Sequence, residues 1–281
     1  MIGRGAAVSK SDFATYAFAL RALKELAVPL RGNVELHFTY DEETGGLAGP
    51  GWLLQQGLTK PDYAICAGFS YNVTTAHNGC LHLERKYAAR PDTGHDALEA
   101  AARLLNALYS YRDILHSRTS STAGITSPTL VVGGINTNVV PDEVTLRLDR
   151  RIIPEEIPND VEAELRAVIT SALQDLPGIS CNIERILLAS PFMPVGDAAR
   201  LRDIVCAESS TELGETVTPI GVPLYFDARL YAEAGVATVM YGAGPRTLLE
   251  ANGLRADEKV PLFTLSVATK AIAWSLVELL T

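Results

Sequence analysis

The chain has 281 residues, a formal net charge of −9 and 47% hydrophobic residues. That length allows two domains or one large one, and the apolar content is enough to bury a full core, which argues against a disordered chain. The negative charge argues against nucleic acid or an anionic membrane surface as a partner. The four cysteines form no Cys-x-x-Cys pair, and no leader-like or bilayer-length apolar segment occurs, so we expect a reduced, cytoplasmic protein.

The first third of the chain alternates helices with strands. Apolar residues recur every three or four positions across residues 9–27, which predicts a helix with one apolar face. Strict alternation at 34–40 predicts a half-buried strand, and a short helix is predicted at 52–57. Strands are expected at 63–67 and 73–83. This order of elements is typical of a layered α/β domain.

The pattern changes after residue 84. Residues 86–94 are basic and contain a proline, which predicts a loop, and a long helix is predicted at 96–116. Further strands are predicted at 128–132, 144–153 and 179–189, with a second helix at 159–176. The set approximates a β-α-β-β-α-β unit whose first strand is poorly represented, so we expect a two-layer α+β domain inserted into the first.

The α/β pattern resumes after Pro191. Helices are predicted at 198–213, 226–234 and 262–280, with a strand at 236–241. The predicted architecture is therefore an α/β domain formed by residues 1–84 and 191–281, interrupted by a smaller α+β domain at residues 85–190.

Three consecutive carboxylates follow the strand predicted at 34–40, in the stretch Tyr40-Asp-Glu-Glu-Thr-Gly-Gly46. Adjacent acids repel, so unless water solvates them they need a cation or a shared proton. Two interpretations stay open at this point: an acidic, solvated loop entry, or a general base beside a metal ligand.

Five stretches occur in a fixed order along nearly the whole chain. They are Gly3-Arg-Gly-Ala-Ala-Val-Ser-Lys10, Tyr40-Asp-Glu-Glu-Thr-Gly-Gly46, Gly133-Gly-Ile-Asn-Thr-Asn-Val-Val-Pro-Asp142, Asp149-Arg-Arg-Ile-Ile-Pro154, and Tyr241-Gly-Ala-Gly-Pro245 followed by Ala256-Asp-Glu258. Together they resemble the metallopeptidase family of acetylornithine deacetylase, succinyl-diaminopimelate desuccinylase and carboxypeptidase G. The resemblance implies a discontinuous, zinc-exopeptidase-like catalytic domain with an inserted lid or dimerisation domain, and two metal ions, Zn²⁺ or Co²⁺.

The resemblance also implies roles for single residues. Glu42 matches the general base that takes a proton from the attacking water, and Glu43 matches a metal ligand. Asn138 and Arg151 match lid positions that touch the substrate, and a guanidinium is suited to bind a carboxylate through two hydrogen bonds. The loop Gly242-Ala-Gly244 matches one whose backbone amides approach the substrate.

Other positions depart from the family pattern. The first histidine and aspartate ligands would lie before Met1, the bridging aspartate corresponds to Val8, a further acidic ligand to Gly68 and the last histidine to Leu254. A divalent ion needs about four ligands or more, so Glu43 alone does not hold two ions. The lid's usual first strand, ending in Ala-His, also has no clear counterpart, which predicts an unpaired sheet edge.

The remaining polar candidates have plainer interpretations. The five histidines lack ligand spacing such as His-x-x-x-His, so His37, His77 and His82 are interpreted as structural. Asp227 and Arg229 fit either a helix cap with an ion pair or, by resemblance, residues that support the metal site.

Two functions remain open. By resemblance the protein hydrolyses the amide bond of N-acyl amino acids or small peptides, as a homodimer formed through the lid. The alternative, favoured by the missing ligands, is a catalytically inactive, metal-free relative: a pseudoenzyme, a binding protein or a truncated gene product.

Overall fold

The computed structural model describes residues 1–89, 97–125, 127–133, 143–175 and 179–281. These residues form two compact units. The first unit comprises Met1–Ala76, Phe192–Gly221 and Phe226–Thr281, and the second comprises His77–Pro191 and Val222–Tyr225. The second unit is thus inserted into the first along the chain.

Three long helices of the first unit confirm the predictions made from apolar periodicity. They are α1 (Lys10–Glu25), α5 (Ala198–Leu213) and α7 (Leu262–Leu280). Helix α7 packs against both α1 and α5. It is long and apolar enough to cross a membrane, yet its Ala268, Ala271 and Ile272 belong to the core of this unit. We therefore interpret α7 as a core helix.

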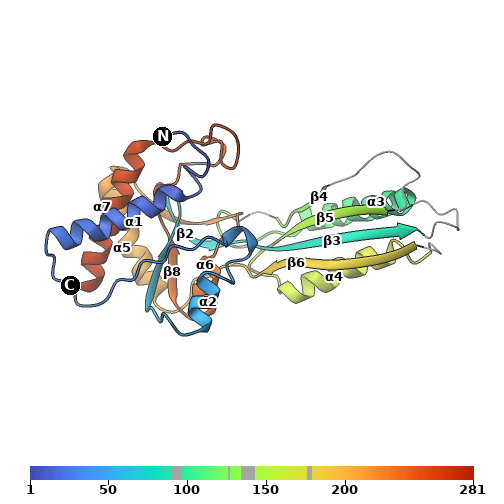
Figure 1. Ribbon diagram of the computed structural model, residues 1–281, viewed down its shortest axis with the longest axis horizontal. Coiled ribbons are helices and arrows are strands. Elements are labelled where there is room, and N and C mark those ends of the chain that lie inside the picture. The colour runs from blue at the N-terminus through green and yellow to red at the C-terminus, as the bar shows by residue number, and fades with distance from the viewer. Residues whose placement is uncertain (90–96, 126, 134–142, 176–178) are drawn as a thin grey trace. The chain divides into compact units, whose positions relative to one another are not determined.

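The sheet of the first unit has the strand order β1-β8-β2-β7. Its strands are β1 (Tyr63–Cys66), β2 (Asn72–His77), β7 (Thr218–Val222) and β8 (Ala237–Met240). Along β8, Val239 packs into the core that α1, α5 and α7 share, whereas Met240 packs with Ala228 and Ala232 of α6 (Ala228–Glu233). The sheet is therefore covered on both faces (Figure 1). Strand β7 was not predicted.

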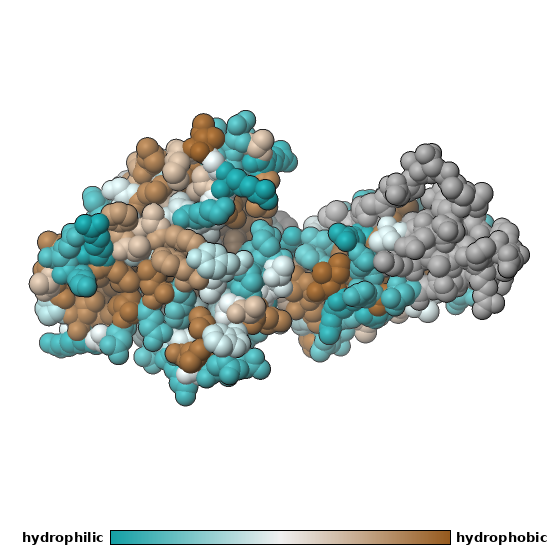
Figure 2. Space-filling view, in the orientation of Figure 1, coloured by the Kyte–Doolittle hydropathy of each residue, from teal (hydrophilic) through white to brown (hydrophobic). Residues whose placement is uncertain are grey.

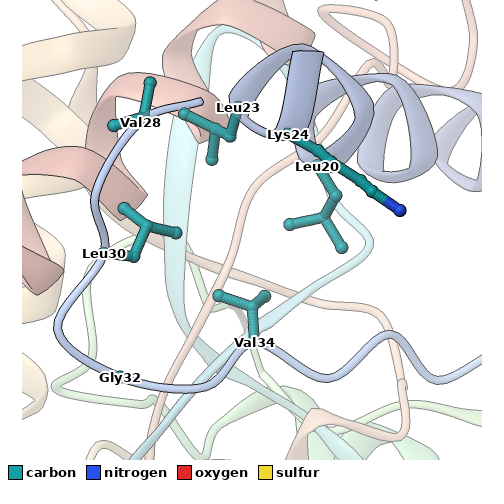
Figure 3. Close-up of a pocket in the computed structure, with 7 residues that line it drawn as sticks. All are labelled: Leu20, Leu23, Lys24, Val28, Leu30, Gly32 and Val34. Atoms are coloured by element: carbon teal, nitrogen blue, oxygen red, sulfur yellow. The ribbon is translucent and has the colours of Figure 1, made fainter. Parts of the chain in front are cut away.

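The predicted strand at 34–40 is wrong. These residues are described but join no strand ladder. Their alternation instead reflects half-burial: Val34 points toward Leu20 and Leu23 of α1 across a pocket of about 270 Å³ (Figure 3), and the ring of Phe38 lies 4.6 Å from that of Phe13. Packing of alternate side chains against helices thus produced the strand-like pattern.

Apolar side chains remain exposed on the first unit. Phe18 of α1 and Trp274 of α7 are each more than half exposed, and Figure 2 shows hydrophobic surface over the helices of this unit. The helix faces that point away from the sheet are therefore less polar than usual for an outer layer.

The second unit is a complete β-α-β-β-α-β arrangement. In chain order it contains β3 (Gly79–Ala89), α3 (Ala97–His116), β4 (Leu130–Gly133), β5 (Glu143–Ile152), α4 (Pro158–Ser171) and β6 (Ile179–Ala189). The strand order is β4-β5-β3-β6, and the pairings are antiparallel. Both helices pack on one face of this sheet around Leu81, Leu83 and Leu148 (Figure 1).

Strand β3 corrects two predictions. The strand predicted at 73–83 is two strands, β2 and β3, and the loop predicted from residue 86 is strand as far as Ala89. Strand β3 pairs with β5 on one side and β6 on the other, so the first lid strand is present and lies inside the sheet, and not at an edge. The predicted domain break after residue 84 falls inside this strand.

A buried arginine lies among the apolar residues of the second unit. Arg150 is fully buried and shares its face of β5 with Leu146, Leu148 and Ile152. Its guanidinium binds Glu156 bidentately, with Nη2–Oε1 at 2.6 Å and Nη1–Oε2 at 3.1 Å. Glu156 also accepts hydrogen bonds from Arg118 and from the backbone amide of Ile153. The charge of Arg150 is thus compensated inside the core.

Candidate active site

The acidic stretch forms a closed loop in the first unit. Asp41 stands at the start of the 3-10 turn η1 (Glu42–Thr44), and its Oδ2 accepts hydrogen bonds from the amides of Ala48 at 2.7 Å and Gly49 at 2.9 Å. Gly45 and Gly46 follow with φ values of 106° and 67°, a backbone region that favours glycine. The first of the three carboxylates therefore shapes the loop.

The next two carboxylates differ in exposure. Glu42 is half-buried, whereas Glu43 is exposed to solvent. Within the described ranges, no group of three or more histidine, cysteine, aspartate or glutamate side chains is arranged to hold a metal ion. Their roles as base and ligand therefore stay predictions.

Arg229 of α6 binds the loop, and Asp227, just before α6, lies against it. A Cβ at Gly46 would lie 2.1 Å from Asp227 Oδ1, so the loop can approach this carboxylate only with glycine there. Arg229 donates from Nη2 to the carbonyl oxygen of Gly45 at 2.7 Å. Asp227 makes no side-chain cap hydrogen bond to α6, so the cap interpretation is wrong. Burial raises the pKa of Asp227 to about 6, Arg229 opposes that rise and Asp41 adds to it.

A fully buried carboxylate, missed from the sequence, lies in α1. Asp12 is 1% exposed, and it accepts hydrogen bonds from the amides of Ala243 at 2.6 Å and Gly68 at 3.3 Å. Burial raises its pKa to about 7, against the opposing effect of these two amides. A Cβ at Gly242 would lie 2.4 Å from Asp12 Oδ1, which explains that glycine by close packing.

Glu258 is also a fully buried carboxylate. It is 1% exposed, and its two oxygens accept hydrogen bonds from four backbone amides. The donors are Gly5, Ala7, Val8 and Leu254, at 2.8 to 3.3 Å. Burial alone would raise the pKa of Glu258, but the four donors outweigh it and hold the pKa below 4.5. Glu258 therefore connects residues 5–8 with Leu254, four residues before Glu258 in the chain.

The replaced metal positions do not fit a divalent ion. The amides of Val8 and Leu254 donate to Glu258, and the amide of Gly68 donates to Asp12. A side chain at Gly68 would bring its Cβ within 2.8 Å of the Tyr241 nitrogen, so this backbone leaves no room for a ligand there. At these three positions, where the resemblance predicts metal ligands, the backbone amides therefore bind the carboxylates of Glu258 and Asp12.

The two glycines predicted to face substrate are buried. The amide of Gly242 donates to the carbonyl of Phe69 at 3.4 Å, and that of Gly244 donates to the carbonyl of Gly68 at 3.0 Å. Ser70 Oγ donates to the carbonyls of both glycines at 3.0 Å. These bonds fix the loop, and its contact with a substrate stays a prediction.

One of the two predicted substrate residues of the lid, Arg151, lies in the described part of the second unit. Arg151 lies in β5 on the sheet face opposite the helices, where it pairs with Asp149, and Asp149 lies 3.5 Å from His82. Sequence reasoning interpreted His82 as structural and did not foresee this cluster. Asn138 lies outside the described residues.

The titration of Asp12 predicts a pH effect on stability. Its pKa is about 7 when folded and 3.8 as a free side chain, so folding takes up a proton between these values. The contribution of Asp12 to stability therefore falls as the pH rises from about 4 to 7. Replacing Asp12 with Asn removes this titration, so the Tm of the variant minus that of the wild type should increase between pH 5 and pH 8. Thermal melts across this range measure the difference, and the exposed Asp203→Asn is the control. A difference that does not vary with pH would contradict the prediction.

Comparisons with known proteins agree with this architecture. The model of Peptidase family M20/M25/M40 matches residues 1–275. An acetylornithine deacetylase from Myxococcus xanthus is 26% identical over 256 residues, which are 87% of this chain and 64% of that protein. The chain thus spans less than two thirds of the length of this relative.

Solved structures share the fold at low identity. Human carnosine dipeptidase 1 has a TM-score of 0.75 at 16% identity, over 99% of this chain and 73% of that one. The di-peptidase Dug1p from Saccharomyces cerevisiae reaches 0.79 at 11% identity, over 99% and 72%. The metallo-carboxypeptidase Sso-CP2 from Sulfolobus solfataricus reaches 0.75 at 16%, over 98% and 77%. The predicted α/β fold class and resemblance are confirmed, and the chain belongs to peptidase family M20/M25/M40.

Proposed function

We propose that the protein hydrolyses the amide bond of N-acyl amino acids or small peptides. The observation that carries this proposal is the family match over residues 1–275. The names of the relatives point the same way, since they include an acetylornithine deacetylase and dipeptidases. We further propose a cytoplasmic protein that forms homodimers through the second unit.

The proposed chemistry assigns one task to each residue. Glu42, half-buried in a loop that Asp41 and Arg229 hold in place, accepts a proton from the attacking water. Arg151 binds the carboxylate of the substrate, and Asn138 and the loop Gly242-Ala-Gly244 line the substrate. Family members generally use zinc or cobalt, and in this chain Glu43 would be a ligand of such an ion. The described residues do not provide a site for two ions.

Replacing Glu42 with Gln tests this proposal. The amide keeps the shape of the side chain but accepts no proton, so kcat should fall by about 10²- to 10⁴-fold. Hydrolysis of N-acetyl-L-ornithine and of carnosine is followed by release of the free amino acid, with the metal content of each sample measured by mass spectrometry. The exposed Glu25→Gln is the control. Wild-type hydrolysis that survives unchanged in Glu42→Gln would show that another group is the base.

A metal-free binding protein is the second candidate. The lack of a ligand group in the described part of the chain, and the absence of space for a side chain at Gly68, favour it. It predicts wild-type protein without bound metal and without hydrolysis, but with measurable affinity for N-acyl amino acids. Stoichiometric zinc or cobalt in the purified protein would contradict this candidate.

A further inference from the structure

Three charged side chains form a cluster on the open face of the second unit's sheet. Register places His82 of β3 opposite Asp149 of β5, and Arg151 follows two residues later on the same face of β5. The intervening residues, Leu81 and Leu148 among them, point into the core beneath the helices. Alternation along two paired strands therefore fixes the cluster on the face opposite the helices.

Asp149 holds the guanidinium of Arg151 along one edge. Its Oδ2 accepts from Nη2 at 3.0 Å and from Nε at 3.2 Å. A guanidinium is planar, so two bonds to one edge fix the direction of the whole group. No described acceptor binds Nη1. The edge of the guanidinium formed by Nη1 and Nη2 can therefore donate two hydrogen bonds to a second carboxylate.

His82 acts on the other oxygen of Asp149. Its Nε2 lies 3.5 Å from Asp149 Oδ1. The hydrogen bond to Asp149 is the main cause that raises the pKa of His82 to about 9, with a smaller contribution from Cys80 and an opposing one from burial. His82 is therefore an imidazolium at neutral pH, and the cluster of two cations and one anion carries a net positive charge.

The other groups around His82 do not cancel this charge. On its own strand, Glu84 is paired with Arg147 of β5 at 2.8 Å, and Cys80 packs against apolar residues. Opposite His82 on β6 stands Leu187, which is apolar, and the exposed carboxylate of Glu184 stands opposite Glu84, two residues along β3 from His82. The positive charge of the cluster is thus available to an anion.

We propose that Asp149 and His82 are positioning residues that present Arg151 to the carboxylate of the substrate. This inference rests on the proposed function, because it takes that carboxylate as the ligand. Asp149 fixes the guanidinium, and protonated His82 keeps the cluster cationic. Loss of the His82 proton leaves a neutral cluster, so affinity for a carboxylate falls as the pH rises through about 9.

Binding measured without turnover tests the inference. Calorimetry compares N-acetyl-L-alanine with its uncharged analogue N-acetyl-L-alaninamide. The wild type should prefer the acid by about tenfold or more, and Arg151→Ala should abolish this preference. Asp149→Asn should weaken binding of the acid by about tenfold and leave the amide unchanged. Arg103→Ala, which removes an exposed cation from α3 of the same unit, is the control and should bind both ligands as the wild type does.

A pH series separates positioning from a general structural role. His82→Gln keeps a donor for Asp149 but has no titrating proton, so its affinity for the acid should be weaker at pH 7 and should not change between pH 8 and 10, where that of the wild type falls. If Asp149→Asn does not fold, Asp149→Glu keeps the charge but moves it, and should also lose the preference for the acid. Full affinity in Asp149→Asn or a wild-type pH profile in His82→Gln would overturn the inference.

The outcomes distinguish this inference from the proposed function. Acid-selective binding that depends on Asp149 but comes without hydrolysis would contradict the proposed function alone. Hydrolysis with full acid selectivity in Asp149→Asn would contradict the inference alone. A wild type that binds both ligands equally would overturn the assignment of Arg151 to a carboxylate, and the inference with it.

Discussion

Replacing Glu156 with Ala is expected to lower the free energy of unfolding of the second unit by about 3–5 kcal/mol. The reason is the fully buried Arg150, which binds Glu156 through two hydrogen bonds and would be left with an uncompensated charge among leucines. Arg118 and the amide of Ile153 would lose the same acceptor. Urea unfolding followed by circular dichroism gives the free energy, and hydrogen exchange in peptides from β3 and β5 locates the loss. Both tryptophans, Trp52 and Trp274, lie in the first unit and report on it separately.

Two further variants separate the buried charge from the loss of a side chain. Glu99→Ala removes an exposed carboxylate paired with Arg103 one helical turn away, and it should cost about 0.5 kcal/mol or less. The double variant Arg150→Met with Glu156→Leu removes both buried charges, and it should recover part of the stability lost in Glu156→Ala. A double variant less stable than Glu156→Ala would show that the charge of Arg150 is not the cause.

The helices were predictable because their information is local. Apolar residues such as Phe13, Ala17 and Leu20 recur every three or four positions and predicted helix α1, although its buried side instead contains Thr15, Ala19 and Leu23, each four residues apart. The end of β3 was not predictable in this way, because Lys86 and its neighbours look like a loop when read by charge alone. Their partners lie on β5 and β6, far along the chain, and these two strands satisfy the backbone of β3. The opposite error occurred at residues 34–40. These residues alternate as in a strand, but no described strand pairs with them.

The candidate site, like the fold, was only partly predictable from the sequence. Sequence motifs located the acidic loop and Arg151, because resemblance requires only residue types and order. They did not show that Glu43 is exposed, or that Asp149 and His82 flank Arg151. Asp12 did leave a signal, since it is an acid on the buried side of α1, in phase with Ala19. Its meaning depends on the amides of residues 68 and 243, which only the folded chain brings near.

Replacing Glu258 with Gln is expected to lower the free energy of unfolding of the first unit by about 2–3 kcal/mol. The four amides that donate to Glu258 are converging donors, and an amide group would offer them one oxygen and turn its own N–H groups toward the rest. Asp257→Asn removes the neighbouring charge from an exposed side chain and is the matched control. Tryptophan fluorescence during urea unfolding measures the difference between the two variants.

The same two variants, Glu258→Gln and Asp257→Asn, also test how the stability of the first unit changes with pH. The four donors hold the pKa of Glu258 in the folded protein below its ordinary value of 4.5. The stabilisation that comes from this carboxylate is therefore complete above about pH 4.5 to 5 and is lost as the pH falls through the folded pKa. The stability gap between the wild type and Glu258→Gln should thus be constant from pH 6 to 8 and should narrow below pH 4.5, whereas Asp257→Asn should stay close to the wild type at neutral pH. A gap that widens in acid would mean that Glu258 is protonated in the folded protein, and that the four amides do not bind a carboxylate.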